Sequence, residues 1–143
     1  MTDGATSIVA DARARVAALL EALGVPAEQD ASGDFTIPHH VTLVHLMVSE
    51  VDGRAVLDIW APILVGAPLT PALARFAAET SFMFGRLCLA DTGDGLAELQ
   101  ISHTMLADPL DEEILVQQLG AVANTAAEIA EAEQATFGGH RSL

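Results

Sequence analysis

The chain has 143 residues, 51% of them hydrophobic, and its 20 acidic and 6 basic residues give a formal net charge of −14. This length suits one domain with a sizeable core, and the acidic surface disfavours nucleic acid and anionic membranes because it repels phosphate. A single cysteine excludes an internal disulfide, and neither a secretory signal nor an apolar run of about 20 residues is present, so we expect a cytoplasmic protein.

The first element is predicted to be a helix over residues 7–23. Apolar side chains recur there at helical spacing, and charged residues mark the opposite side. Gly24 stands where a left-handed helix cap belongs, and Pro26 follows as a stop. Residues 27–33 are polar and predict a loop.

Three strands are expected next. A short one covers residues 34–37 and ends before a proline. The run 41–51 is apolar on both alternating sets of positions, which indicates a central strand covered on both faces, or one whose second face awaits a partner. Asp52-Gly53 predicts a hairpin turn into a return strand over 54–61, after which residues 64–68 form a connector.

The second half of the chain predicts a helix, a hairpin and a helix. Thr70-Pro71 provides a cap followed by proline and starts a helix that ends near Thr80. Residues 84–106 read as two strands joined by a turn rich in Asp and Gly. Asp108-Pro109 opens the long last helix with the same cap-then-proline device, and residues 138–143 are expected to be a frayed tail.

These elements predict an α+β fold. The order is helix, three strands, helix, two strands, helix, so five mostly hairpin-linked strands form an antiparallel sheet on which the helices pack. Neither an internal repeat nor a domain linker is evident. We therefore expect a single domain over residues 1–143, with its ordered core at about 7–137.

Three local features accompany this order over roughly residues 7–135. They are the strand that carries 57–62, the Phe84-Gly85-Arg86-Leu87 entry into the fourth strand, and the long helix after Asp108-Pro109-Leu110. With them, the chain resembles the type III secretion chaperone-like and YbjN-like superfamily. The resemblance implies a small, acidic and usually dimeric protein that binds polypeptide segments through apolar patches and strand edges. It implies no ATPase, and the chain has no Lys with which to build a P-loop.

Two sets of apolar residues follow as candidate interfaces. The resemblance favours the second helix and the fourth strand as the seam of a homodimer. We expect that seam to contain Leu73, Phe76, Phe82, Phe84 and Leu87. The sheet face around the single tryptophan is the candidate surface for a partner, by addition of an extended segment to the sheet. We expect it to contain Val44, Leu46, Val48, Val56 and Trp60.

The histidines are weak candidates for a metal site. His39 and His40 follow one another at a strand end, where neighbouring side chains point to opposite faces. His45 and His103 lie within strands and could approach across the sheet. The alternative is a neutral His103 packed in the core with solvated His39 and His40, and on this basis we predict no metal.

No catalytic residue is predicted either. Cys88 shares its strand face with Arg86, whose charge could lower the thiol pKa, but no base or orienting group is identifiable, so a small buried thiol is expected. Paired carboxylates stand mostly in turns or at helix starts, where they serve structure. They are Asp91, Asp94, Asp108, Asp111, Glu112 and Glu113.

We therefore expect a non-enzymatic, cofactor-free module that holds a segment of a partner protein. Its acidity suits a basic or amphipathic polypeptide. The alternative is a small-ligand or signal-sensing domain that uses a cavity between the sheet and the helices, lined by His103 and Met105.

Overall fold

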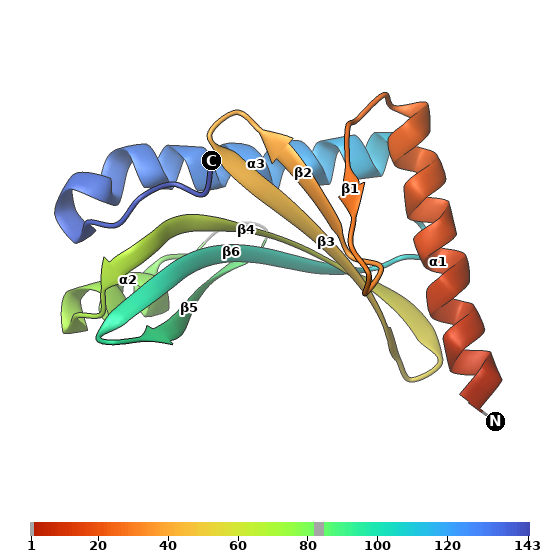
Figure 1. Cartoon of the computed structure of the whole chain (residues 1–143), viewed down its shortest axis with the longest axis horizontal. Helices are drawn as coiled ribbons and strands as arrows, with labels where there is room; N and C mark the ends of the chain where they lie inside the picture. Colours follow the sequence, from red (N-terminus) through yellow and green to blue (C-terminus); the bar gives the residue numbers. More distant parts are fainter. Residues whose placement is uncertain (1, 82–84) are drawn as a thin grey trace.

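The computed structural model of the chain describes residues 2–81 and 85–143. Six strands form one antiparallel sheet in the order β1-β2-β3-β4-β6-β5. Figure 1 shows the helices around it. The elements are α1 (Thr2–Ala22), β1 (Glu28–Gln29), β2 (Phe35–His39), β3 (Thr42–Val51), β4 (Arg54–Pro68), α2 (Pro71–Glu79), β5 (Arg86–Gly93), β6 (Leu96–Leu106) and α3 (Glu112–Phe137).

The predicted class is confirmed, and the predicted strand count is wrong. The sheet is antiparallel and helices pack on it, but it has six strands instead of five. The added strand, β1, is two residues long within the predicted polar loop, and pairs with β2 through Glu28↔Thr36 and Gln29↔Phe35. A two-residue strand is too short to carry a period-2 pattern, so the sequence gives no sign of it.

β4 is longer than expected and includes residues 64–68, which were predicted to form a connector. It runs to Pro68, and Pro62 lies inside it, paired with Gln100 of β6. The β3–β4 ladder begins only at His45↔Trp60. Proline is tolerated at this position because the ladder with β3 has ended, so no ladder hydrogen bond is lost, and the Thr42 hydroxyl of β3 donates to the Pro62 carbonyl oxygen at 3.0 Å instead.

The core lies between one face of the sheet and the helices α1 and α3. α3 contacts β3, β4 and β6, and α1 contacts β3, β4 and α3. Alternate strand residues point into this layer, as the period-2 geometry requires. The largest fully buried strand side chains are Val44, Leu46, Leu57, Ile59, Ile63, Leu64, Leu99 and Ile101.

Both later helices carry side-chain caps. The Thr70 hydroxyl accepts a hydrogen bond from the Leu73 amide at 3.2 Å, as the sequence predicts. α3 is capped by Asp111, whose carboxylate accepts from the Ile114 amide at 2.8 Å. The helix start predicted at Asp108-Pro109 is therefore three residues early, and Asp108 is free to pair with Arg54.

Residues 138–143 are not a frayed tail. His140 forms an isolated bridge with Val65 of β4, and the Ser142 hydroxyl reaches the start of β3. Within the described part of the chain, no helix is both long and apolar enough to cross a membrane.

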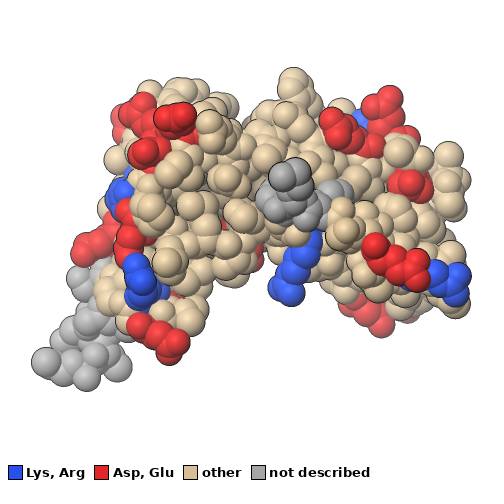
Figure 2. Space-filling view, turned by 180° about the vertical axis from the view of Figure 1, so that it is seen from behind, with Lys and Arg blue, Asp and Glu red and all other residues tan. Residues whose placement is uncertain are grey.

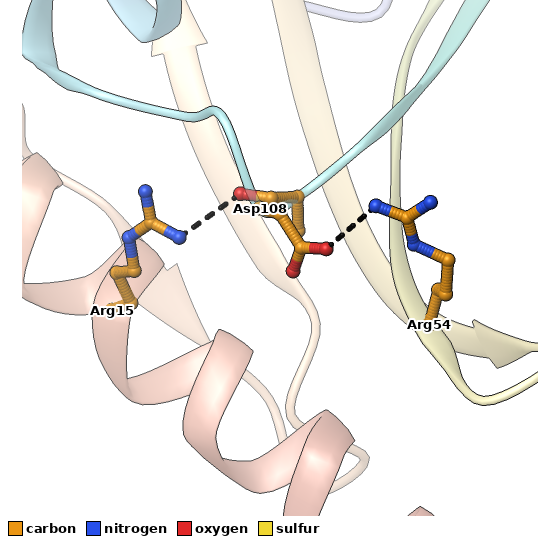
Figure 3. A network of polar contacts seen from close by, with 4 residues as sticks. Arg15, Arg54 and Asp108 are labelled. Carbon is orange, nitrogen blue, oxygen red and sulfur yellow. Dashed lines mark hydrogen bonds and ion pairs between the residues drawn. The ribbon is translucent and has the colours of Figure 1, made fainter.

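Two arginines approach the turn between β6 and α3 from opposite sides (Figure 3). From α1, Arg15 donates to the carbonyl oxygens of Ala107, at 3.1 Å, and of Leu110. From β4, Arg54 pairs with Asp108 at 3.0 Å, but these two side chains are 56% and 61% exposed. The hydrogen bonds of Arg15 join α1 to the turn between β6 and α3, whereas water screens the Arg54–Asp108 pair.

Replacing Arg15 with alanine is expected to lower the free energy of unfolding by about 1–2 kcal/mol, because two turn carbonyls lose a charged donor. Replacing Arg54 should lower it by less than about 0.5 kcal/mol. Urea unfolding of both variants at matched salt measures the difference. Equal losses would contradict the tying role of Arg15.

Candidate functional site

The sheet face opposite the core is here called the open face. Residues directly opposite one another on neighbouring strands share a face, and the register runs Thr36↔His45, His45↔Trp60 and Trp60↔Ser102 across four strands. Flanking residues on each strand alternate with core residues and complete this face. It contains Thr36, Leu43, His45, Met47, Val56, Asp58, Trp60, Arg86, Cys88, Gln100, Ser102, Thr104 and Leu106.

The centre of the open face is a ring stack. The imidazole of His45 lies on the indole of Trp60, with ring centroids 4.2 Å apart and planes inclined by 25°. His45 Nδ1 lies 3.2 Å from the Thr36 hydroxyl, which orients the imidazole. Both rings are half-buried, so each keeps an exposed part for contact with another molecule.

Burial lowers the pKa of His45 below its ordinary value, and the carboxylates of Glu98, Asp34 and Asp30 oppose this shift without reversing it. The neutral imidazole is therefore the favoured form at neutral pH. Hydrogen bonds from Ser32 and from the Asp34 amide lower the pKa of Asp30, which keeps that carboxylate ionised nearby. A neutral, stacked histidine presents a mostly apolar centre to a partner.

Trp60 is the single tryptophan and the chain has no tyrosine, so its emission reports on this stack alone. We expect the emission to change on acidification with a midpoint below the ordinary histidine pKa of about 6.5, as the imidazole gains a proton. Because the folded pKa is lowered, the stability that His45 contributes is complete above about pH 6.5 and falls as pH drops toward the folded pKa. His45→Gln should remove the transition, and a midpoint at or above 6.5 would contradict the burial argument.

A groove extends the open face at its β1 end. Its volume is about 400 Å³. Thr36 and Leu43 belong to both the groove and the open face, so the two form one continuous surface. The other lining residues are Pro26, Ala27, Glu28 and Pro38.

The structure divides the predicted partner surface in two. Val44, Leu46 and Val48 are 1%, 0% and 3% exposed and point into the core, so the prediction that they contact a partner is wrong. The helices α1 and α3 pack on the face of β3 that carries these three residues. The sequence of the strand does not specify which face the helices cover. Val56 and Trp60 lie half-buried on the open face and remain candidates.

The residues predicted for a dimer seam are also divided. Leu73 is 0% exposed within the protomer, which removes it from any seam. Phe76 packs on Phe137 of α3 with ring centroids 5.2 Å apart, and Leu87 lies half-buried against the core. Phe82 and Phe84 lie outside the described residues.

The histidine and cysteine candidates are dispersed. His39 and His40 lie edge to face with centroids 4.4 Å apart, whereas His103 is on the core side of β6, opposite Ile59. Among residues 2–81 and 85–143, no three His, Cys, Asp or Glu side chains group closely enough to hold a metal. Cys88 is half-buried on the open face, with its sulfur 3.8 Å from the Ser102 hydroxyl, so the buried site expected for it is wrong.

Where the helices meet the sheet, a pocket of about 380 Å³ lies between α1 and the β1–β2 pair and is lined in part by Leu20 and Phe35, and two smaller pockets lie elsewhere. One of about 140 Å³ lies between α3 and the β2–β3 hairpin and is lined in part by Ile37 and Leu119. The other, of about 250 Å³, lies between α1 and the β6–α3 turn and includes Arg15. None of these three pockets is lined by His103 or Met105, which the small-ligand alternative places at its site.

Several residues of the open face were not predicted from the sequence. Leu43 and Met47 form the second apolar set of β3, and Leu106 ends β6 on the same face. Met47 and Leu106 are 39% and 40% exposed. The available signal was Trp60 itself, because its cross-strand neighbours identify the face once the register is known.

The family model that matches this chain is described as "T3SS (YopN, CesT) and YbjN peptide-binding chaperone 1", and it matches residues 10–143. Among solved structures, the Yersinia pestis type III secretion chaperone SycH, in complex with a stable fragment of YscM2, is 14% identical. The match covers 82% of this chain and 98% of that one, with a TM-score of 0.57.

YbjN from E. coli is 17% identical, with 87% of this chain and 93% of that one covered and a TM-score of 0.60. At such identities, both likenesses show the fold alone. No curated protein sequence matches the chain.

Proposed function

The chain belongs to the TY-Chap1 family of type III secretion and YbjN peptide-binding chaperones, and from this premise we propose that it holds a segment of a partner protein on the open face. The supporting observation is the half-buried His45–Trp60 stack at the centre of a sheet face that α1 and α3 leave uncovered. Exposed Met47 and Leu106 widen this apolar centre. The similar chaperone SycH is found with a fragment of another protein, which is the same class of ligand.

A partner segment has room to lie across the strands of the open face and into the groove at Thr36 and Leu43. Aromatic and aliphatic anchors at the centre of such a surface supply most of the binding free energy. Beside that centre, the exposed Thr104 hydroxyl donates to the half-buried Asp58 carboxylate at 3.2 Å, and this pair supplies polar contacts on the open face.

The partner is proposed to be basic or amphipathic. The formal net charge is −14, and on the side of the molecule drawn in Figure 2 Asp and Glu gather toward the two ends, with arginine and mostly uncharged residues between them. A segment with an apolar centre and cationic flanks complements this distribution, and charge complementarity raises the rate of association. The proposed setting is the cytoplasm.

A homodimer through α2 and the outer edge of β5 is part of the same proposal. α2 contacts β5, and β5 is an edge strand that pairs only with β6 among the described strands. Of the predicted seam residues, Phe76 and Leu87 are half-buried. Light scattering across a concentration series tests this state, and a monomer mass throughout would contradict it.

The function is tested with a peptide selected on the whole chain from a random display library. We expect saturable binding that changes the emission of Trp60, because the indole lies at the centre of the proposed surface. Affinity should fall as salt rises through the physiological range if cationic flanks contribute. Selection that yields no saturable peptide, or binding that leaves the emission unchanged, would contradict the proposal.

A further inference from the structure

β3 and β4 separate at one end of their hairpin. Their ladder extends from Val51↔Arg54 to His45↔Trp60 and no further. Beyond it, β6 is the one described strand that continues a ladder with β4 to Pro68, with register shifts on either side of Leu64. β3 reaches β4 there through the Thr42 hydroxyl, which donates to the Pro62 carbonyl oxygen at 3.0 Å. One side of this stretch of β4 therefore lies next to the start of β3 without a ladder between the two strands.

Residues 138–143, here called the return segment, enter this gap. His140 and Val65 exchange two backbone hydrogen bonds, of 2.9 Å from the His140 amide and 2.7 Å from the Val65 amide. The Ser142 hydroxyl accepts from the Leu43 amide at 2.9 Å and lies 3.2 Å from the Thr42 hydroxyl. Figure 1 shows the return segment leaving α3 and running back above β4 toward β3. The chain thus forms a single antiparallel bridge to its own sheet, with the backbone pairing that peptide ligands use in strand addition.

The gap is selective at two positions of the return segment. Gly139 has φ +78°, and an added Cβ would lie 2.7 Å from the Val65 carbonyl oxygen and 3.0 Å from the Ala67 amide nitrogen. Only glycine fits there without displacing backbone. Three residues on, the Ser142 hydroxyl satisfies a β3 amide. His140, between these two positions, is exposed, and Leu143, after them, is 59% exposed. The gap therefore does not restrict the side chains at these two places.

We propose that this gap is a second binding seat, which accepts an extended partner segment with glycine followed three residues later by serine or threonine. The return segment occupies the seat as an internal competitor until the partner displaces it. The seat rests on the proposed function, since it supplies the held partner with a second contact. Two backbone hydrogen bonds and one hydroxyl hold the return segment to the strands, a small number that permits displacement.

The test uses the full chain and a dye-labelled hexapeptide with the return segment's own sequence, Gly-Gly-His-Arg-Ser-Leu. Gly139→Val unseats the return segment through the close contacts at Val65 and Ala67. The apparent affinity for the hexapeptide, measured by anisotropy, should rise roughly tenfold or more, because an internal competitor at about millimolar effective concentration is removed.

Gly53→Ala is the matched control. Gly53 has φ +76° and open space around its Cβ position, so the substitution adds similar backbone strain at the far end of β4 without touching the gap. This variant should bind the hexapeptide as weakly as the unmodified chain. Equal affinity in the Gly139→Val and Gly53→Ala chains would overturn the seat.

If the Gly139→Val chain does not fold, Ser142→Ala in the full chain provides a second test of the seat. It removes one hydroxyl and should raise hexapeptide affinity severalfold, whereas a hexapeptide with alanine in place of its serine should bind severalfold more weakly. No change in either measurement would overturn the seat. The return segments could instead exchange between two copies of the chain, which would be seen as a dimer that Ser142→Ala dissociates. That result would make a second copy the occupant of the seat and would overturn the proposal of a partner segment.

The library peptide separates this inference from the proposed function. Its effect on Trp60 emission should be the same in the Gly139→Val chain as in the unmodified chain, because His45 and Trp60 make none of the return segment's hydrogen bonds. If that peptide binds and the hexapeptide does not, the seat alone is wrong. If neither binds, both the seat and the open-face function are wrong.

Discussion

Replacing Leu46 with alanine is expected to lower the free energy of unfolding by about 3 kcal/mol. Leu46 is 0% exposed on the core side of β3 and opposite Ile59, so truncation leaves a cavity between the sheet and the helices. Thermal or urea unfolding measures the loss. Where the variant remains folded, its affinity for the library peptide should be close to that of the unmodified chain, because the leucine does not reach the open face.

Met47→Ala, one position along the strand, is the matched control. Met47 is 39% exposed on the open face, opposite Asp58. Its truncation should change stability by less than about 0.5 kcal/mol and should weaken peptide binding. If Leu46→Ala were mild and Met47→Ala strongly destabilising, the core and open faces of β3 would be assigned the wrong way round.

This pair of residues shows where prediction from the sequence stopped. The run 41–51 is apolar at both alternating sets of positions, so its pattern predicts a strand without saying which set faces the helices. That choice depends on where α1 and α3 pack, which is tertiary information. The even-numbered residues of this run, such as Leu46, were predicted to lie on the partner surface, whereas the structure places them in the core.

Elements with a strong local cause were predicted correctly. Asp52-Gly53 forms the β3–β4 turn with both residues at positive φ, as a two-residue hairpin loop requires. The Thr70 cap and the following proline begin α2 as expected. These features depend on residues that are neighbours in the sequence, so their signals need no knowledge of the fold.

Long-range contacts account for most of what was missed. The two-residue β1 exists because it pairs with β2, and residues 138–143 are ordered because His140 meets Val65 of β4. Neither segment has an internal pattern that predicts its partner. The same holds for the site, where Trp60 was a candidate from the sequence but its stack with His45 depends on strand register.

Replacing Trp60 with alanine is expected to weaken binding of the library peptide at least tenfold, which corresponds to about 1.4 kcal/mol or more. The indole is the largest side chain of the open face, and its loss also leaves the His45 imidazole without its stacking partner. Because this variant has no tryptophan, calorimetry or the anisotropy of a labelled peptide must replace emission as the measurement. Trp60→Phe keeps an aromatic ring against His45 and should retain most of the affinity.

Val116→Ala is the control for truncation of an exposed apolar residue elsewhere. Val116 is 48% exposed on α3, which packs on the opposite face of the sheet. Its replacement should leave peptide affinity unchanged, since it lies away from the open face. A loss of binding in Val116→Ala with none in Trp60→Ala would move the peptide site to the helical side and contradict the open-face proposal. Equal losses in both would indicate non-specific apolar binding, because a specific site depends on a few central anchors.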